Sequence, residues 1–187
     1  MSRLINRRTV LWGLGATSLV AWADAPVGSK RFTLEWIAFK QPGNHAAPSP
    51  PPTIADVLAL PGRVTALANS VNQMTNTAQA LNRKGHEVLS HQAWAAIIPP
   101  NGRTTATLHD VLSSPSPLSG AIAIQRGQHL LLNVEVDYQS VSGVTYGVRE
   151  HRRIKFNEYH YFDHPAFGVI IQVRPPKNDA ESDESGA

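Results

Sequence analysis

The chain has 187 residues, of which 17 are lysine or arginine, 14 are aspartate or glutamate, and none is cysteine. The lack of cysteine excludes disulfides, thiolate metal sites, a thiol nucleophile and a lipid-modified cysteine. The length is sufficient for one buried core. The sequence contains neither an internal repeat nor an apolar run long enough to span a membrane.

Residues 1–23 have the features of an export signal. A basic start without acids precedes an apolar run from Val10 to Trp22. That run is shorter than the roughly 20 apolar residues needed to cross a bilayer. We therefore expect a cleaved signal and a soluble periplasmic protein without a stable membrane anchor, and an uncleaved anchor is the alternative.

Two cleavage positions fit the pattern of small residues, after Ala23 and after Ala25. We prefer Ala23, because the other cut would leave Pro26 next to the cleaved bond. The pair Arg7-Arg8 leaves the twin-arginine export route open, although the general secretory route is preferred. Residues 24–30 are then a linker, and residues 31–176 form one domain.

The charge of the expected mature chain is balanced. The signal contains three arginines and no acid, so 14 basic and 14 acidic residues remain after its removal. Residues 177–187 hold four acids and no base beyond Lys177, and we expect this acidic tail to be disordered. Export and the lack of a large basic cluster argue against nucleic acid as a partner.

The first half of the domain predicts two strands around one helix. Arg31–Lys40 is predicted to be a central strand, because it is apolar on both faces from Trp36 onward. Hydrophobic residues recur at spacings of three and four over Pro61–Lys84, which predicts the main amphipathic helix. Val88–Ile98 is predicted to be the next strand, with the proline-rich loop at residues 41–52 before the helix.

Trp94 lies in that second strand and has two interpretations. The favoured one places the indole in the core, because the strand is largely apolar. The alternative makes Trp94 an aromatic platform on which a sugar ring stacks. We keep Trp94 among the candidate binding residues on the second interpretation.

The second half predicts a hairpin and then a cationic strand. Leu118–Ile124 and His129–Tyr138 alternate apolar and polar residues around a turn at Gly127, after a loop at residues 99–117 with a helical turn near residues 108–112. Alternation continues over Tyr146–Phe156, where every second residue forms a positively charged face, which we call the cationic stripe: Arg149, His151, Arg153 and Lys155.

The cationic stripe is either a solvated face paired with Glu135 and Asp137 of the hairpin, or a docking surface for an acidic polymer or partner. Arginine suits docking, because its planar guanidinium pairs bidentately with carboxylate or phosphate. The solvated face is the more economical interpretation, because antiparallel sheets often keep one wet face.

The segment from Asp163 to Pro165 is predicted to be a corner before the last strand, Val169–Val173. Proline pushes His164 into an extended conformation, and Gly168 fits where the chain is tightly packed. The histidines around Asp163 also raise the alternative of a metal-dependent hydrolase using His160, Asp163 and His164. Because His160 and His164 would lie about 13 Å apart on a regular strand, this requires a sharp fold between them, and we predict no metal site, no other cofactor and no enzyme.

The C-terminal block has an unusual composition. Arg152-Arg153 precedes Glu158-Tyr159-His160-Tyr161-Phe162-Asp163-His164-Pro165, and Phe167-Gly168 then leads into the apolar strand. This block resembles the CsiV-type family of periplasmic peptidoglycan-binding proteins, and His91-Gln92-Ala93-Trp94 is a weaker similarity. The chain departs from the family pattern at Ala95-Ala96.

The resemblance implies a non-catalytic periplasmic protein that binds peptidoglycan. It also implies that the protein assists regulation of peptidoglycan synthesis through an outer-membrane lipoprotein activator of a wall synthase. From the residues, we expect ligand or partner contacts at Arg149, His151, Arg153, Lys155, His160 and Trp94, and structural roles for Arg152, Asp163, His164, Pro165 and Gly168. The predicted fold is a single α+β domain, a mostly antiparallel sheet with one main helix on one face.

Overall fold

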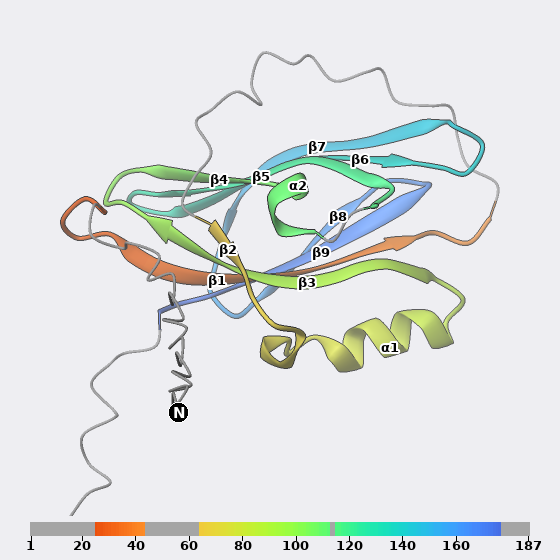
Figure 1. Cartoon of the computed structure of the whole chain (residues 1–187), viewed down its shortest axis with the longest axis horizontal. Coiled ribbons are helices and arrows are strands. Elements are labelled where there is room, and N and C mark those ends of the chain that lie inside the picture. Colours follow the sequence, from red (N-terminus) through yellow and green to blue (C-terminus); the bar gives the residue numbers. More distant parts are fainter. Residues whose placement is uncertain (1–24, 44–63, 113–114, 177–187) are drawn as a thin grey trace, which may run out of the picture.

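The computed structural model describes residues 25–43, 64–112 and 115–176. The predicted export signal, most of the proline-rich loop and the acidic tail lie outside these ranges. Within them, nine strands form two antiparallel sheets, which Figure 1 shows as stacked layers with one helix beneath the lower sheet. The predicted α+β class with mostly antiparallel pairing is confirmed, and the strands are divided between two sheets rather than one.

The first sheet has five strands in the order β2-β3-β1-β9-β8. Its strands are β1 (Lys30–Lys40), β2 (Val64–Ala66), β3 (Glu87–Ile98), β8 (Tyr159–Asp163) and β9 (Phe167–Arg174). The first strand lies between β3 and the last strand, β9, so its predicted central position is confirmed.

The second sheet has four strands in the order β4-β5-β6-β7. Its strands are β4 (Arg103–Thr107), β5 (Leu118–Arg126), β6 (Leu130–Gln139) and β7 (Thr145–Ile154). The predicted hairpin appears as β5 and β6, and β7 pairs along the whole of β6. The strand β4 was not predicted, because its threonines and its position among prolines and serines are typical of a loop.

The main core lies between the two sheets and follows the two-residue period of the strands. The first sheet contributes residues such as Leu34 and Trp36, and the second contributes residues such as Ile122 and Val134. The short helix α2 (Leu108–Val111), which matches the predicted helical turn, adds Leu108 and Val111 to this core. The other face of each sheet is therefore left for a helix or for solvent.

The main helix, α1 (Thr75–Arg83), is shorter than the predicted range of residues 61–84. Within the described part of that range, Val64–Ala66 is the edge strand β2, and Asn69–Val71 is a single 3-10 turn. Helical spacing gave the wrong prediction here, because β2 pairs with β3 and Val64 packs against the main core, and such tertiary contacts override helix propensity.

Helix α1 packs on the outer face of the five-stranded sheet. Met74 and Ala78 cover Ile37 and Phe39 of β1 in a small second core. The predicted packing of one helix on one face is thus confirmed. No helix among the described residues is long and apolar enough to cross a membrane.

Candidate functional site

The cationic stripe faces outward from the four-stranded sheet. Arg149, His151 and Arg153 alternate along β7 with residues that face the core, such as Val148 and Ile154. The three side chains are exposed, as the two-residue period predicts. The outer face of this sheet is therefore the surface on which the cations are presented.

Arg149 is the most strongly paired member of the stripe. One of its terminal nitrogens donates to both carboxylate oxygens of Asp137 on β6, at 2.6 and 2.8 Å. A second nitrogen donates to the carbonyl of Val136, and Glu135 lies directly opposite Arg149 in the pairing register. The predicted proximity of these two acids to the stripe is confirmed, and the charge at this end is largely compensated.

The uncompensated charge lies at the other end of β7. Within the described ranges, the side chains of His151 and Arg153 have no hydrogen-bond or ion-pair partner. Arg153 is opposite the half-exposed Leu131, and the same row of the sheet continues through Gln125 to the exposed Arg103 on the far edge.

Lys155 lies beyond the end of β7, in the turn that takes the chain from one sheet to the other. Its ammonium forms an exposed ion pair with Glu158 at 3.5 Å. The sequence predicted one strand to Phe156, but pairing ends at Ile154 and β8 starts at Tyr159 in the opposite sheet. Lys155 therefore continues the positive surface around the end of the sandwich rather than along the strand.

Arg152 points the other way and joins the two sheets. Its guanidinium lies 4.3 Å from the centre of the Phe162 ring on β8 and donates to the carbonyl of Tyr161. It also pairs with Glu150 on the same strand. These contacts suit the structural role expected for Arg152, because they hold β7 against β8 where no ladder connects them.

The predicted corner is the turn between β8 and β9. His164 and Phe167 exchange backbone hydrogen bonds, and the Nδ1 of His164 accepts from the amide of Ala166. Pro165 is exposed at the tip of this turn. At Gly168, a Cβ would lie 2.7 Å from Phe39 and 2.8 Å from Tyr161, so glycine permits those two rings to stack.

Asp163 accepts hydrogen bonds from two side chains rather than from the backbone across the corner. The Tyr161 hydroxyl donates to it at 2.5 Å, and the Gln41 amide donates at 3.0 Å. Burial raises the pKa of Tyr161, and the hydrogen bond to Asp163 and the charge of that carboxylate raise it further. The cluster links the end of β1 to β8 and holds the phenol in its protonated form.

The two histidines of the proposed metal cluster are engaged separately. His160 lies on a regular strand and contacts the carbonyl of Lys155 at 3.2 Å. His164 lies beyond that strand, against the rings of Tyr146 and Phe167. The fold between them that a shared ion requires is not formed, and the described residues contain no group of three potential metal-ligating side chains.

Trp94 is part of the core. Its side chain is 0% exposed, and its ring meets that of Trp36 edge to face at 6.1 Å. The interpretation of Trp94 as a sugar platform is therefore wrong for this conformation, because strand alternation turns it between the two sheets. The exposed rings of the C-terminal block are those of Phe156, Tyr159 and Tyr161.

A buried carboxylate, Glu35, forms a network that the sequence analysis missed. It lies on β1, is 0% exposed, and accepts from the amides of Gln73 and Met74 at 2.8 and 2.7 Å, just before helix α1. The Nε2 of His91 lies 2.8 Å away, and Arg174 of β9 forms an ion pair with the same group. A lone acid inside an apolar strand was the available signal, because such a charge requires buried partners.

Burial by itself raises the pKa of Glu35, but hydrogen bonds from Gln73, His91, Met74 and Arg174 outweigh it, and the pKa is lowered from 4.5. A carboxyl with a lowered folded-state pKa stabilises the fold above its unfolded value, and this contribution is lost as the pH falls through the folded value.

We therefore expect the stability difference between the wild type and Glu35→Gln to be constant above about pH 4.5 and to shrink as the pH falls below it. Urea unfolding of both proteins from pH 7 downward measures this difference. A difference that grows on acidification would contradict the lowered pKa.

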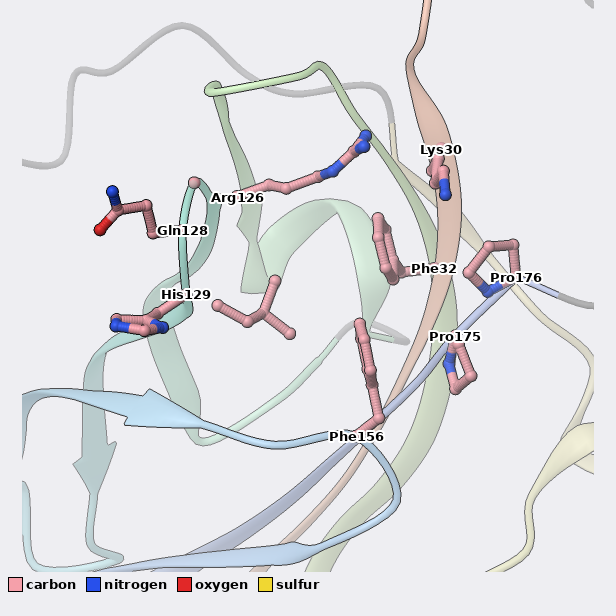
Figure 2. Close-up of a pocket in the computed structure, with 10 residues that line it drawn as sticks. Lys30, Phe32, Arg126, Gln128, His129, Phe156, Pro175 and Pro176 are labelled. Carbon is pink, nitrogen blue, oxygen red and sulfur yellow. The ribbon is translucent and has the colours of Figure 1, made fainter.

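A pocket opens at the end of the sandwich, where the two sheets part. It has a volume of about 340 Å³ and is lined by the start of β1, the β5–β6 turn, the β7–β8 turn and the end of β9. Figure 2 shows Phe32 and Phe156 on its wall with Arg126 extended above them. The two rings stack at 5.6 Å. No sequence pattern predicted this pocket, because four distant segments form it.

The fold and its surfaces define a class of protein: a small β-sandwich with an exposed basic face and an end pocket. Comparison with known families identifies the class further. Residues 25–176 match the model of the family described as "Peptidoglycan-binding protein, CsiV", and the chain belongs to this family. No curated protein and no solved structure matched the chain.

Proposed function

We propose that this protein is a non-catalytic periplasmic protein that binds peptidoglycan through the outer face of the four-stranded sheet. The observation that carries the proposal is the exposed Arg153 on β7, whose guanidinium no acid of the described residues pairs with, and Lys155 follows it around the end of the sandwich. The stem peptides of the wall bear carboxylates, with which arginine and lysine form charge-assisted hydrogen bonds.

The contacts of Arg149 limit its part in binding. Because Asp137 already accepts two of its hydrogen bonds, a wall carboxylate would have to displace that ion pair. Arg153 has no such competitor within the described residues, and His151 lies two residues before it on the same face. We therefore place the centre of the docking surface at Arg153.

The matching family model begins at residue 25, directly after the segment with the features of an export signal, which supports periplasmic localisation. N-terminal sequencing of the protein recovered from the periplasm tests this. An N-terminus at Asp24 is expected, and retention of Met1 on a membrane-bound protein would contradict the cleaved signal.

Binding is expected to depend on charge at the end of β7. Changing Arg153 and Lys155 together to glutamate should reduce co-sedimentation of the mature protein with purified sacculi by about tenfold or more at low salt, because two attractive contacts become repulsive. The wild-type binding should also weaken as salt is added. The measurement is the bound fraction as a function of sacculus concentration.

The matched control changes Arg83 and Lys84 together to glutamate, which makes the same change in net charge at two exposed residues at the end of helix α1, outside the other sheet. It should bind as the wild type does. If the protein with glutamate at positions 153 and 155 bound sacculi as well as the wild type, the β7 surface would not be the docking face. Another surface of the protein would then bind the wall.

The protein also assists regulation of wall synthesis through a lipoprotein activator of a synthase; this part of the proposal is supported by the resemblance of the C-terminal block. Pull-down of the activator's periplasmic domain by the mature protein tests it. Capture that survives digestion of all peptidoglycan by a muramidase is expected, and loss of capture after digestion would show that the wall alone links the two proteins.

A further inference from the structure

The end pocket contains the features of a ligand site that no family description assigns. Its volume of about 340 Å³ lies within the range of small-molecule sites. Phe156 is 42% exposed and stacks on the buried Phe32, so one aromatic face forms part of the wall. Leu130 and the prolines at 175 and 176 complete the apolar side.

The polar side of the pocket is cationic. Lys30 and Arg126 line it together with His129, and no aspartate or glutamate is among the described residues around it. Arg126 donates to the carbonyl of Gly28 at 2.9 Å, which fixes its guanidinium at the mouth and leaves its other donors for a ligand. Lys30 is exposed, and its ammonium has no partner within the described ranges.

This combination selects one kind of ligand. Two cations without a neighbouring acid favour an anion, and the planar guanidinium suits a carboxylate. The apolar wall next to them favours a compact group such as a methyl or a saturated ring beside that carboxylate. A neutral sugar has no anionic group with which Lys30 and Arg126 could form an ion pair.

We propose that this pocket binds the carboxylate end of a peptidoglycan fragment, with the carboxylate on Lys30 and Arg126 and the adjoining apolar group on Phe156. This inference rests on the proposed wall binding and names the part of the wall that is recognised. The fragment is the carboxyl terminus of a stem peptide, where a D-alanine methyl adjoins a free carboxylate, or the lactyl carboxylate of N-acetylmuramic acid. In intact wall, an amide bond to the peptide masks the second carboxylate.

Four soluble probes separate these sources, and two-dimensional NMR of the full mature chain reports binding. The probes are N-acetyl-D-alanyl-D-alanine, its C-terminal amide, N-acetylmuramic acid and N-acetylglucosamine. We expect the dipeptide acid to shift the amides of Lys30, Arg126–Leu130 and Phe156. We expect the dipeptide amide to bind about tenfold more weakly, because one charge-assisted contact is lost.

Binding of N-acetylmuramic acid without binding of the dipeptide acid supports the same pocket and assigns the carboxylate to the glycan. Equal binding of the dipeptide acid and its amide, binding of N-acetylglucosamine as tight as that of the acids, or shifts confined to other residues would overturn the proposal. No shift with any probe would overturn it too.

Variants test the residues. Lys30→Gln and Phe156→Ala should each weaken the preferred acid about tenfold, whereas Lys84→Gln, which removes a distant exposed charge, should leave it unchanged. Phe156→Leu keeps an apolar wall and should retain most of the binding, so it answers the objection that Phe156→Ala perturbs the fold. Unaltered affinity in Lys30→Gln would contradict the assignment of the carboxylate.

The outcomes also separate this inference from the proposed function. Wild-type protein that sediments with sacculi but shows no shift with the probes removes the pocket and leaves wall binding intact. Probe-induced shifts at the pocket in a protein that does not sediment with sacculi remove wall binding and leave a carboxylate site.

Discussion

Glu35→Gln is expected to lower the free energy of unfolding by roughly 3–5 kcal/mol, the range for removal of one partner from a buried ion pair. The change is nearly isosteric, so the loss does not arise from a cavity. It arises because Arg174 and His91 keep their positions near a neutral amide. The amide's nitrogen would also take the place of one carboxylate oxygen and leave the backbone N–H of either Gln73 or Met74 without its acceptor. Urea unfolding at pH 7 measures the loss.

The matched control for this prediction is Glu87→Gln. Glu87 is on the neighbouring strand β3 and pairs with Lys40 at 3.8 Å, but both side chains are exposed. Exposed pairs contribute at most about 1 kcal/mol, so the control should remain close to the wild type. If the two variants lost similar small amounts, the buried network would not be an anchor of the fold.

Trp94→Ala is expected to destabilise the fold by about 3–5 kcal/mol, because it removes a large, fully buried ring that packs against Trp36. The same variant should still bind sacculi under conditions in which it is folded, because the ring is not on the surface. Thermal unfolding gives the first quantity and co-sedimentation well below the midpoint gives the second.

Tyr159→Ala is a suitable comparison for Trp94→Ala, since Tyr159 is an aromatic residue of the same sheet that is 55% exposed. A surface substitution of this kind usually changes stability by about 0.5 kcal/mol or less. A stable Trp94→Ala protein that had lost sacculus binding would restore the platform interpretation of Trp94.

The strands were the predictable part of the fold, because each alternates in a way that the two faces of a sheet impose. The hairpin of β5 and β6 follows from the inward row at Leu132, Val134 and Val136, and the structure buries all three. The central position of β1 follows from its continuous apolar run. Pairing partners in the first sheet were not predictable, because β1 pairs with β9 from the opposite end of the chain.

The length of helix α1 could not be predicted from the local spacing of hydrophobic residues. Apolar residues continue at helical spacing before Thr75, but spacing alone does not reveal that a sheet edge is available at β3. The division into two sheets was missed for a similar reason. Nothing in residues 155–158 predicts that the chain crosses from β7 to the other layer, where Asn157 adopts a positive φ of 61°.

For the candidate site, the sequence predicted which residues share a strand face but not which of them are paired in the folded protein. Alternation correctly placed Arg149 and Arg153 on one face, and it correctly suggested Asp137 as a neighbour. It could not show that Asp137 compensates Arg149 and leaves Arg153 free of a partner among the described residues. The end pocket, which brings Lys30 beside Phe156, depends on tertiary contacts that no single segment contains.

The position of the Glu35 carboxylate has a consequence for the order of biosynthetic events. Its most distant partner, Arg174, is 139 residues further along the chain. While only the first strands have left the ribosome, Glu35 is without Arg174, and burying its carboxylate in an incomplete core is unfavourable. Early compaction is therefore disfavoured. Contacts between residues so far apart in the sequence also form slowly. Translation should therefore be almost complete before the polypeptide commits to its native topology.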